Sequence, residues 1–241
     1  MEEPIREIPV GDLCCLRGHF VITSQPSDPQ AEKQKFSGVI HIISDFDYLL
    51  GVPREQELPV QVAYHNPASQ TFLQGAFVNV SGLLLVDYDS EGKPHLTLAP
   101  DELRPQPGDP STREYVEQSL RSFPMLNPSV VLSGIVTAIP LDKPECRVYT
   151  LHVHVPHEDG STGLGWDGTY SDYEVHCAIP MTVRWGNQPL PQVNDLCFVT
   201  GELSGLYRVG DRQSPLVYAM RMGIINRPPL EGDLASIDNN A

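Results

Sequence analysis

One strand-turn-strand pattern occurs twice in the chain, and it restricts the fold more than any other feature of the sequence. Residues 193–225 predict two β-strands joined by a polar turn, with apolar residues on both faces of the first strand. Residues 76–99 repeat this pattern, and Gly82 lines up with Gly201 in the middle of that strand. A glycine within a strand allows the bend or bulge that closes a small barrel. The chain is therefore predicted to use one small β-domain twice.

The composition favours many short strands over long helices. The 241 residues include 23 prolines and 19 glycines, and few apolar residues recur at helical spacing. No apolar run reaches the roughly 20 residues that span a bilayer. The N-terminal sequence Met-Glu-Glu-Pro is acidic, whereas a signal peptide begins with a basic segment. An intracellular protein without membrane contact is therefore expected.

The cysteines argue against a disulfide framework. Cys14, Cys15, Cys146, Cys177 and Cys197 have an odd total and no CxxC spacing. This arrangement predicts buried free thiols in a reducing compartment and no structural zinc site.

The formal net charge is −15, and the acidic excess is larger in the first half of the chain. Residues 1–127 carry 18 acidic and 9 basic residues, whereas residues 128–230 carry 10 and 7. An acidic chain is repelled by phosphate at long range, which argues against strong general binding to nucleic acid. If either half contacts nucleic acid, the second half is the better candidate.

The order of apolar, polar and turn-forming segments predicts two sets of five strands with a helix between them. The expected strands are 13–23, 36–44, 59–65, 76–86 and 94–99 in the first set, and 130–139, 148–155, 174–179, 196–203 and 216–225 in the second. The helix is expected near 111–122, because Asp109-Pro110 provides a cap and a proline in the first turn. It serves either as a strut between the domains or as a docking surface for a partner.

These segments divide the chain into four parts. They are a first barrel at 1–103, a Pro-rich linker and short helix at 104–127, a second barrel at 128–228 and an acidic disordered tail at 229–241.

The strand pattern resembles the OB fold. Glycine lies in the first and fourth strands of each set, and Pro-x-x-Asn-Asp precedes the fourth strand of the second set. The matching segments are 133–136 and 191–201 in the second half, and 16–18 and 75–82 in the first. The resemblance implies an all-β protein of two five-stranded OB-like barrels joined by the linker and short helix. This layout is similar to subunits of the replication protein A type and to telomere-capping proteins.

The resemblance also implies where binding would occur. OB folds typically bind oligonucleotides or oligosaccharides across strands two and three and the loops that join strands one–two and four–five. Single strands require aromatic faces for stacking and cations for the backbone. The candidates in the second barrel are Arg147, Tyr149, Trp166, Tyr170, Tyr173, Arg208 and Arg212.

A structural role for these residues is the alternative interpretation. Asp159, Asp167, Asp172 and Glu174 surround the loop aromatics, so the aromatics can pack on the barrel while the arginines pair with acids. An aromatic and acidic loop suits a protein partner at least as well as a phosphate backbone. The first barrel has aromatics crowded by acids, which predicts a structural or protein-binding role for it.

The segment His152-Val-His154 followed by Glu158 has the sharpest resemblance to a metal site. It resembles the first metal motif of cupins, and two histidines on one strand face with a carboxylate can bind a divalent metal. However, Cys146 stands where the cupin motif has glycine, and no second motif follows. An outward histidine face is the simpler interpretation. The sequence has no GxSxG, P-loop or HExxH motif, so no catalytic residue and no cofactor is predicted.

We therefore predict a non-enzymatic OB-fold subunit of a nucleic-acid-handling complex, as in DNA replication, repair or telomere maintenance, in the nucleus rather than the cytoplasm. In this hypothesis the first barrel and helix hold protein partners, and the second barrel contacts single-stranded DNA. Two alternatives remain open. One is a protein-interaction or self-assembly scaffold, which the net charge favours and which is compatible with a homo-oligomer. The other is a metal-dependent cupin-like enzyme.

Overall fold

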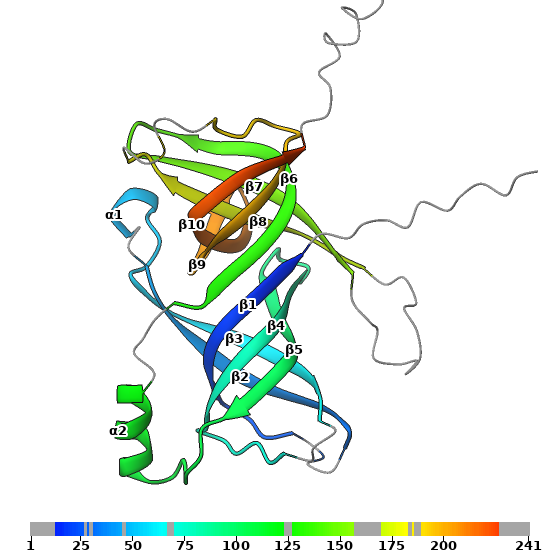
Figure 1. The fold of residues 1–241 in the computed structure, drawn as a ribbon, viewed down its shortest axis with the longest axis vertical. Helices are drawn as coiled ribbons and strands as arrows, with labels where there is room; N and C mark the ends of the chain where they lie inside the picture. The colour runs from blue at the N-terminus through cyan, green and yellow to red at the C-terminus, as the bar shows by residue number, and fades with distance from the viewer. Residues whose placement is uncertain are drawn as a thin grey trace, which may run out of the picture.

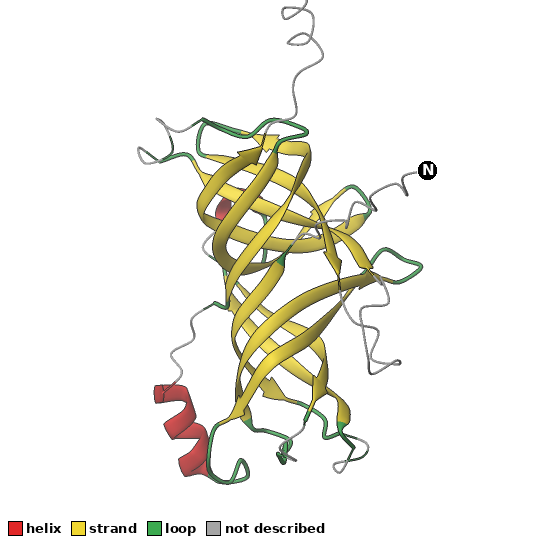
Figure 2. Cartoon of the chain, turned by 45° about the vertical axis from the view of Figure 1, so that its right-hand side comes forward, coloured by secondary structure: helices red, strands yellow, loops and turns green. Residues whose placement is uncertain are grey.

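The computed structural model describes residues 13–26, 28, 31–44, 47–66, 70–122, 127–156, 170–182, 185 and 189–226. These residues form two β-barrels that follow one another along the long axis of the molecule, with the helix α2 (Arg113–Ser122) beside the first barrel (Figure 2). Within these ranges, no helix is long and apolar enough to cross a membrane.

The first barrel is built from strands β1 to β5. Their bounds are β1 Cys14–Ile22, β2 Lys33–Ile43, β3 Glu55–His65, β4 Phe77–Tyr88 and β5 Pro94–Pro105, and the short helix α1 (Asp47–Leu50) lies between β2 and β3. The strand order is β2-β3-β5-β4-β1, and a pairing of β1 with β2 closes the barrel. β3 and β5 are parallel, and the other neighbours are antiparallel.

The second barrel repeats this arrangement. Its strands are β6 Ser129–Asp142, β7 Cys146–Pro156, β8 Tyr170–Pro180, β9 Leu196–Val209 and β10 Arg212–Asn226. The order is β6-β7-β8-β10-β9, β9 pairs with β6 to close the barrel, and β8 and β10 are parallel. The all-β class with two five-stranded OB-like barrels is confirmed.

The two barrels are joined because β1 also pairs with β6. Antiparallel pairs connect Cys14 with Leu132 and Arg17 with Ser129. The first strands of the two barrels therefore lie side by side at the centre of the molecule (Figure 1). One cluster of buried apolar side chains extends through both barrels. The sequence-derived bounds for independent domains stay a prediction.

Most strands extend beyond the bounds that the sequence predicts, and β5 and β9 differ most. The pattern predicts an end at Ala99, whereas β5 continues to Pro105. A register shift between Ser81 and Gly82 keeps β5 paired with β4 on both sides of the irregularity. Among the described residues, β5 pairs with β3 only at Leu96–Leu98, so its other edge is unpaired at Pro100 and Pro105. Proline is tolerated at such an unpaired edge, because it has no N–H to donate.

The fourth-strand glycines lie at bulges, as the sequence predicts. A Cβ at Gly82 would clash with the carbonyl oxygen of Ala99, and one at Gly201 would clash with that of Tyr218. The partner strand of each glycine shifts register there. Gly82 and Gly201 are therefore structurally equivalent positions.

The first-strand glycines are not equivalent, although the sequence pattern matches them. Gly18 pairs with Val80, which corresponds to Val199 of the second barrel. Gly134 pairs instead with Cys197, two residues away from Val199. In the structure, Gly134 therefore lies two residues away from the position that is equivalent to Gly18.

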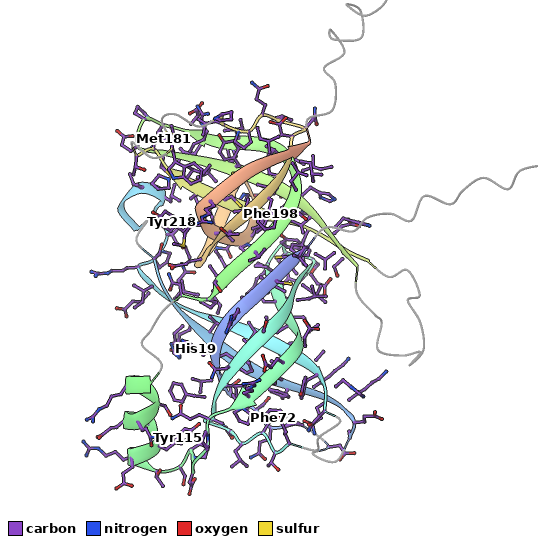
Figure 3. All side chains as sticks on the ribbon, viewed as in Figure 1. His19, Phe72, Tyr115, Met181, Phe198 and Tyr218 are labelled. Atoms are coloured by element: carbon purple, nitrogen blue, oxygen red, sulfur yellow. The ribbon has the colours of Figure 1, made fainter. Side chains whose placement is uncertain are left out.

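The predicted helix forms, and it packs on the first barrel. Asp109 accepts a hydrogen bond from the backbone N–H of Ser111 at 2.9 Å, immediately before α2. Tyr115 is buried, and its hydroxyl accepts a hydrogen bond from the backbone N–H of Phe77 at 2.9 Å. Figure 3 shows Tyr115 between α2 and the barrel.

The five cysteines are free, and Cys15 is the one among them that is partly exposed. Burial raises the pKa of the Cys14 thiol to about 12. Such thiols are protonated and unreactive at neutral pH, and the burial of four of the five agrees with the predicted buried free thiols.

Candidate nucleic-acid interface

The outer face of β2, β3 and β5 in the first barrel is accessible to solvent. Side chains alternate along these strands, so every second residue points away from the core. We call this surface the open face. Its residues are Lys33, Lys35, Ser37, Val39, His41, Glu57, Pro59, Gln61, Ala63, His65, His95 and Thr97. Lys33 lies opposite His65 and Lys35 opposite Ala63, so two lysines and a histidine gather at the start of β2.

Each histidine of the open face has a carboxylate partner. The pairs are His41–Glu57 at 3.5 Å, His65–Glu32 at 2.7 Å and His95–Asp89 at 3.5 Å. All three pairs are solvent-exposed, so each contributes little to stability. They balance the charge of the face when the histidines are protonated.

The corresponding face of the second barrel is covered by the first barrel. We call it the covered face. Its residues are Val148, Thr150, His176, Ala178, Ser214 and Leu216 of β7, β8 and β10. Leu49 and Leu50 of α1, with Val52 after it, pack against Val148 and Leu216 in a small cluster separate from the main core. Figure 1 shows α1 beside the strands of the second barrel.

Two further segments of the first barrel reach the second. The hydroxyl oxygens of Tyr88 and Ser214 are 2.7 Å apart. The guanidinium of Arg212 lies 4.7 Å from the centre of the Tyr88 ring. The Gln56 side-chain oxygen accepts a hydrogen bond from the backbone N–H of Leu206 at 3.3 Å. These contacts leave no room for a ligand across the middle of the covered face.

A buried histidine lies at the centre of the covered face. His176 Nδ1 is 3.1 Å from Thr150 Oγ1, and its ring packs edge-on against Tyr207 with 5.4 Å between ring centres. Burial lowers the pKa of His176 to about 4. The neutral ring is therefore part of the packing at physiological pH, and it is not available to bind phosphate.

Tyr149 and Tyr173, which the sequence places among the stacking residues, are buried in the barrel core. The Tyr173 hydroxyl donates to the carbonyl oxygen of Leu84 in the first barrel. Burial raises the pKa of Tyr173 well above its ordinary value. Both tyrosines occupy inward positions of β7 and β8, so neither ring can stack on a base in this structure.

The three predicted arginines have different surroundings. Arg147 forms an ion pair with Asp142, with 2.6 Å between Nη2 and Oδ1, and its guanidinium also donates to Tyr149. Arg208 and Arg212 are exposed on the two strands beside the β9–β10 turn. The charge of Arg147 is therefore balanced by Asp142, whereas Arg208 and Arg212 remain accessible. Their role in binding stays a prediction.

Part of the predicted site falls outside the described residues. Trp166 and Glu158 lie there, and Tyr170 begins β8 without a described side chain. Their roles stay predictions.

His152 and His154 lie on the outer face of β7, and both approach one carboxylate. His154 Nδ1 is 2.5 Å from Asp172 Oδ1, and His152 Nε2 is 3.4 Å from the same oxygen. The hydrogen bond from His154 lowers the pKa of Asp172. Among the described residues, no group of three or more His, Cys, Asp or Glu side chains is arranged to hold a metal ion.

No protein-family model matches the chain, and no curated protein matches it. A deletion variant of the single-stranded DNA binding protein from Thermus aquaticus matches in structure, with 17% sequence identity and a TM-score of 0.50. The match covers 92% of this chain and 98% of the Thermus chain. Both barrels also have the closed five-strand order described above. The chain is a tandem OB-fold protein.

Two other solved structures resemble parts or all of this tandem OB-fold protein. The small single-stranded DNA-binding protein from Streptomyces coelicolor matches 41% of this chain and 92% of its own, with 16% identity and a TM-score of 0.30. Fission yeast Pot1, in a structure with single-stranded DNA, matches 94% and 87%, with 7% identity and a TM-score of 0.26. Likeness at these identities concerns the fold alone.

Sequence reasoning did not anticipate the covered face. It predicts a short helical turn within residues 45–57, where Leu49 and Leu50 are apolar in an otherwise acidic loop. Adjacent apolar residues in such a loop indicate that the segment packs against something. The pairing of β1 with β6 decides that the partner surface is the second barrel.

Proposed function

We propose that this tandem OB-fold protein binds single-stranded nucleic acid without enzymatic activity, and that the strand lies across the open face of the first barrel. One observation carries the proposal. OB folds typically bind across strands two and three, and within the described structure this surface is accessible in the first barrel and occupied in the second. The covered face is the reason for choosing the first barrel, although the sequence favours the second.

The open face has suitable chemistry at one end. Lys33 and Lys35 supply positive charge for phosphates near the start of β2. Ser37 and Gln61 supply neutral donors and acceptors next to them, with 3.0 Å between Gln61 Nε2 and Ser37 Oγ. The imidazole of His65 provides a planar ring for stacking on a base. The nearby carboxylates keep the surface close to neutral, which predicts modest affinity that falls as the salt concentration rises.

Arg208 and Arg212 would extend this path onto the second barrel. Arg212 already lies against Tyr88 at the end of β4, next to the β4–β5 turn of the first barrel. A Cβ at Gly92 in that turn would be 3.4 Å from the carbonyl oxygen of Asp211. The β4–β5 turn of the first barrel thus lies against the β9–β10 turn of the second barrel. In our proposal the strand leaves the open face at this junction.

We further propose that the protein works as a subunit of a nuclear complex for DNA replication, repair or telomere maintenance. The tandem arrangement supports this proposal, because OB folds commonly serve in protein assemblies as well as in binding. Copurification of DNA-associated proteins with the full chain is the corresponding measurement.

Fluorescence anisotropy of a labelled oligo-thymidine strand, at low and moderate salt, tests the binding proposal. The variant Lys33→Glu/Lys35→Glu should weaken binding about 10-fold or more at low salt, and it should reduce the salt slope by about one to two. The control Arg113→Glu/Arg121→Glu makes the same charge change on α2, away from the open face. It should change the affinity by less than about two-fold.

Two outcomes would contradict the proposal. Absence of binding at low salt would reject nucleic-acid binding itself. Binding that survives Lys33→Glu/Lys35→Glu but is lost in Arg208→Ala/Arg212→Ala would move the site to the second barrel.

A protein-interaction or self-assembly scaffold is the second candidate function. An exposed apolar patch on the outer side of β6, β9 and β10 favours it. Self-association without any binding to oligo-thymidine would support this candidate over the first.

A further inference from the structure

The second barrel carries an exposed apolar patch that the proposed nucleic-acid site does not use. The apolar patch consists of Leu13 (40% exposed), Ile135 (43%), Phe198 (40%) and Ile225 (57%). Ser133 connects its members, because it pairs with Phe198 and its hydroxyl accepts a hydrogen bond from the backbone N–H of Leu13 at 3.0 Å. Ile135 lies two residues beyond Ser133 on β6, and Ile225 lies two residues beyond Gly223 on β10, at a register shift. Figure 3 shows Phe198 over the strands of the second barrel.

The centre of the apolar patch is open to solvent. Phe198 of β9 lies opposite Gly223 of β10. Apart from its two chain neighbours, no residue that the structure describes has a heavy atom within 4 Å of a Cβ built at Gly223, so this position opens to solvent. Phe198 is itself exposed and is therefore accessible to a partner.

The equivalent surface of the first barrel is polar, so the fold does not require apolar residues there. The equivalence of Gly82 and Gly201 aligns Asn79 with Phe198, because each lies three residues earlier. Asn79 pairs with Arg104 across β4 and β5, as Phe198 pairs with Gly223. Asn79 and Arg104 are both exposed. Two folded barrels thus carry opposite chemistry at the same positions.

We propose that the apolar patch is a self-association surface, and that a second copy of this chain covers it through a two-fold contact. A two-fold axis places the same patch on both sides of the interface, so apolar side chains meet apolar side chains. The contact uses the outer side of β6, β9 and β10 together with Leu13, which precedes β1. Packing the apolar patch against the first barrel of the partner instead would bury charges such as those of Arg104 and Arg17 against Phe198.

If a second copy of this acidic chain binds, charge directs it to this surface, where few acidic residues oppose the contact. With a net charge of −15, two copies repel one another over most approaches. Val131, Ser133 and Thr200 surround the apolar patch and are uncharged. Arg221 and Glu202, on β10 and β9 beside Thr200, have opposite signs, so a two-fold contact can place unlike charges together. The patch also continues the sheet that joins the two barrels.

Sedimentation velocity of the full chain over a range of concentrations tests this proposal. The wild-type protein should be a dimer at about 100 μM. The variant Phe198→Asn/Gly223→Arg gives the second barrel the residues that the first barrel has at these positions. It should be folded by circular dichroism, and its dimer dissociation constant should rise about 10-fold or more.

Two controls separate the apolar patch from other surfaces. Thr200→Ser introduces the residue that the first barrel has at the position of Ser81, and Leu120→Asn removes an exposed apolar side chain from α2. Both should leave the dimer unchanged. If the double variant does not fold, Gly223→Arg alone is the probe, because its side chain enters open space.

The proposal is overturned if the wild-type protein is monomeric at about 100 μM. It is equally overturned if a folded Gly223→Arg variant dimerises as tightly as the wild type, or if Leu120→Asn dissociates the dimer. These readouts do not involve nucleic acid, so they are independent of the binding experiment.

Discussion

The open face and the covered face occupy the same place in two barrels of one fold, yet one is exposed and the other is packed. Pairing within the barrels aligns Ser37, Gln61 and Thr97 of the first barrel with Thr150, His176 and Leu216 of the second. At the start of β2, Lys33 and Lys35 take the positions that Cys146 and Val148 hold at the start of β7. The lysines keep one face in water, whereas the cysteine and valine form the cluster that receives Leu49, Leu50 and Val52.

This difference shows how two copies of one fold acquire different roles within a chain. A lysine is costly to bury without a partner, and a buried valine is stabilised by removal of its apolar surface from water. Substitutions along one strand are therefore enough to convert a binding surface into a packing surface. The second barrel becomes the support, and the first barrel retains an accessible face.

The largest expected effect concerns the packing of the covered face. Val52→Asp places a carboxylate in a buried apolar cluster, so it should lower the free energy of unfolding by about 3 kcal/mol or more. Val39→Asp makes the same change on the open face, where the cost should be below about 1 kcal/mol. Urea unfolding of both variants measures the difference. Equal costs would mean that Val52 does not pack on the second barrel in solution.

A pH effect follows from His176. Its folded pKa of about 4 lies below that of the unfolded chain, so the unfolded state binds the proton more readily. The contribution of His176 is fully present above about pH 6.5, and about 3 kcal/mol is lost as the pH falls to about 4. His176→Gln should flatten the pH dependence of the unfolding free energy over this range. An unchanged slope in His176→Gln would contradict burial of a neutral ring.

A smaller effect tests the hydrogen bond between the barrels. Tyr173→Phe removes the donor to Leu84, which should cost about 1–2 kcal/mol in unfolding free energy. Tyr149→Phe removes a hydroxyl with a long contact of 3.4 Å to Arg147, so its cost should be smaller. Chemical denaturation compares the two. A larger cost for Tyr149→Phe would show that the contact between barrels contributes less than the one within a barrel.

The smallest effect on stability is expected at the open face. Lys35→Val introduces the residue that the covered face has at the position of Val148, but nothing packs on it in the first barrel. The unfolding free energy should change by less than about 0.5 kcal/mol, while binding to oligo-thymidine should weaken by about 3-fold or more. Thermal unfolding and anisotropy provide the two readouts. A clear gain in stability would mean that another surface already covers this face.

Local patterns were sufficient to predict the elements of this fold. Each of β1 to β10 overlaps a strand predicted from apolar runs bounded by Gly, Pro and polar turns. The cap at Asp109 placed α2, and the paired glycines placed the bulges at Gly82 and Gly201. The ends of the strands were predicted less accurately. β5, for example, continues past Pro100 because its pairing with β4 continues there, and the local sequence does not show this pairing.

The candidate site could not be predicted to the same extent. Tyr149 and Tyr173 were assigned to stacking because aromatics near strands two and three suit a binding surface. A shift of one residue along a strand moves a side chain from the outer face into the core, and both tyrosines are in the core. Arg147 meets Asp142 across the β6–β7 turn, and such pairs depend on geometry that spacing alone does not define.

The amino-acid sequence by itself thus determined two five-stranded barrels, their bulges and the helix between them, because these depend on periodicity and on residues such as glycine and proline that act locally. The tertiary structure alone decided which face remains open. That choice depends on the pairing of β1 with β6, which brings α1 onto strands of the second barrel that are distant from it in the sequence. Contacts between segments so distant in sequence leave no local signal that identifies the partner surface.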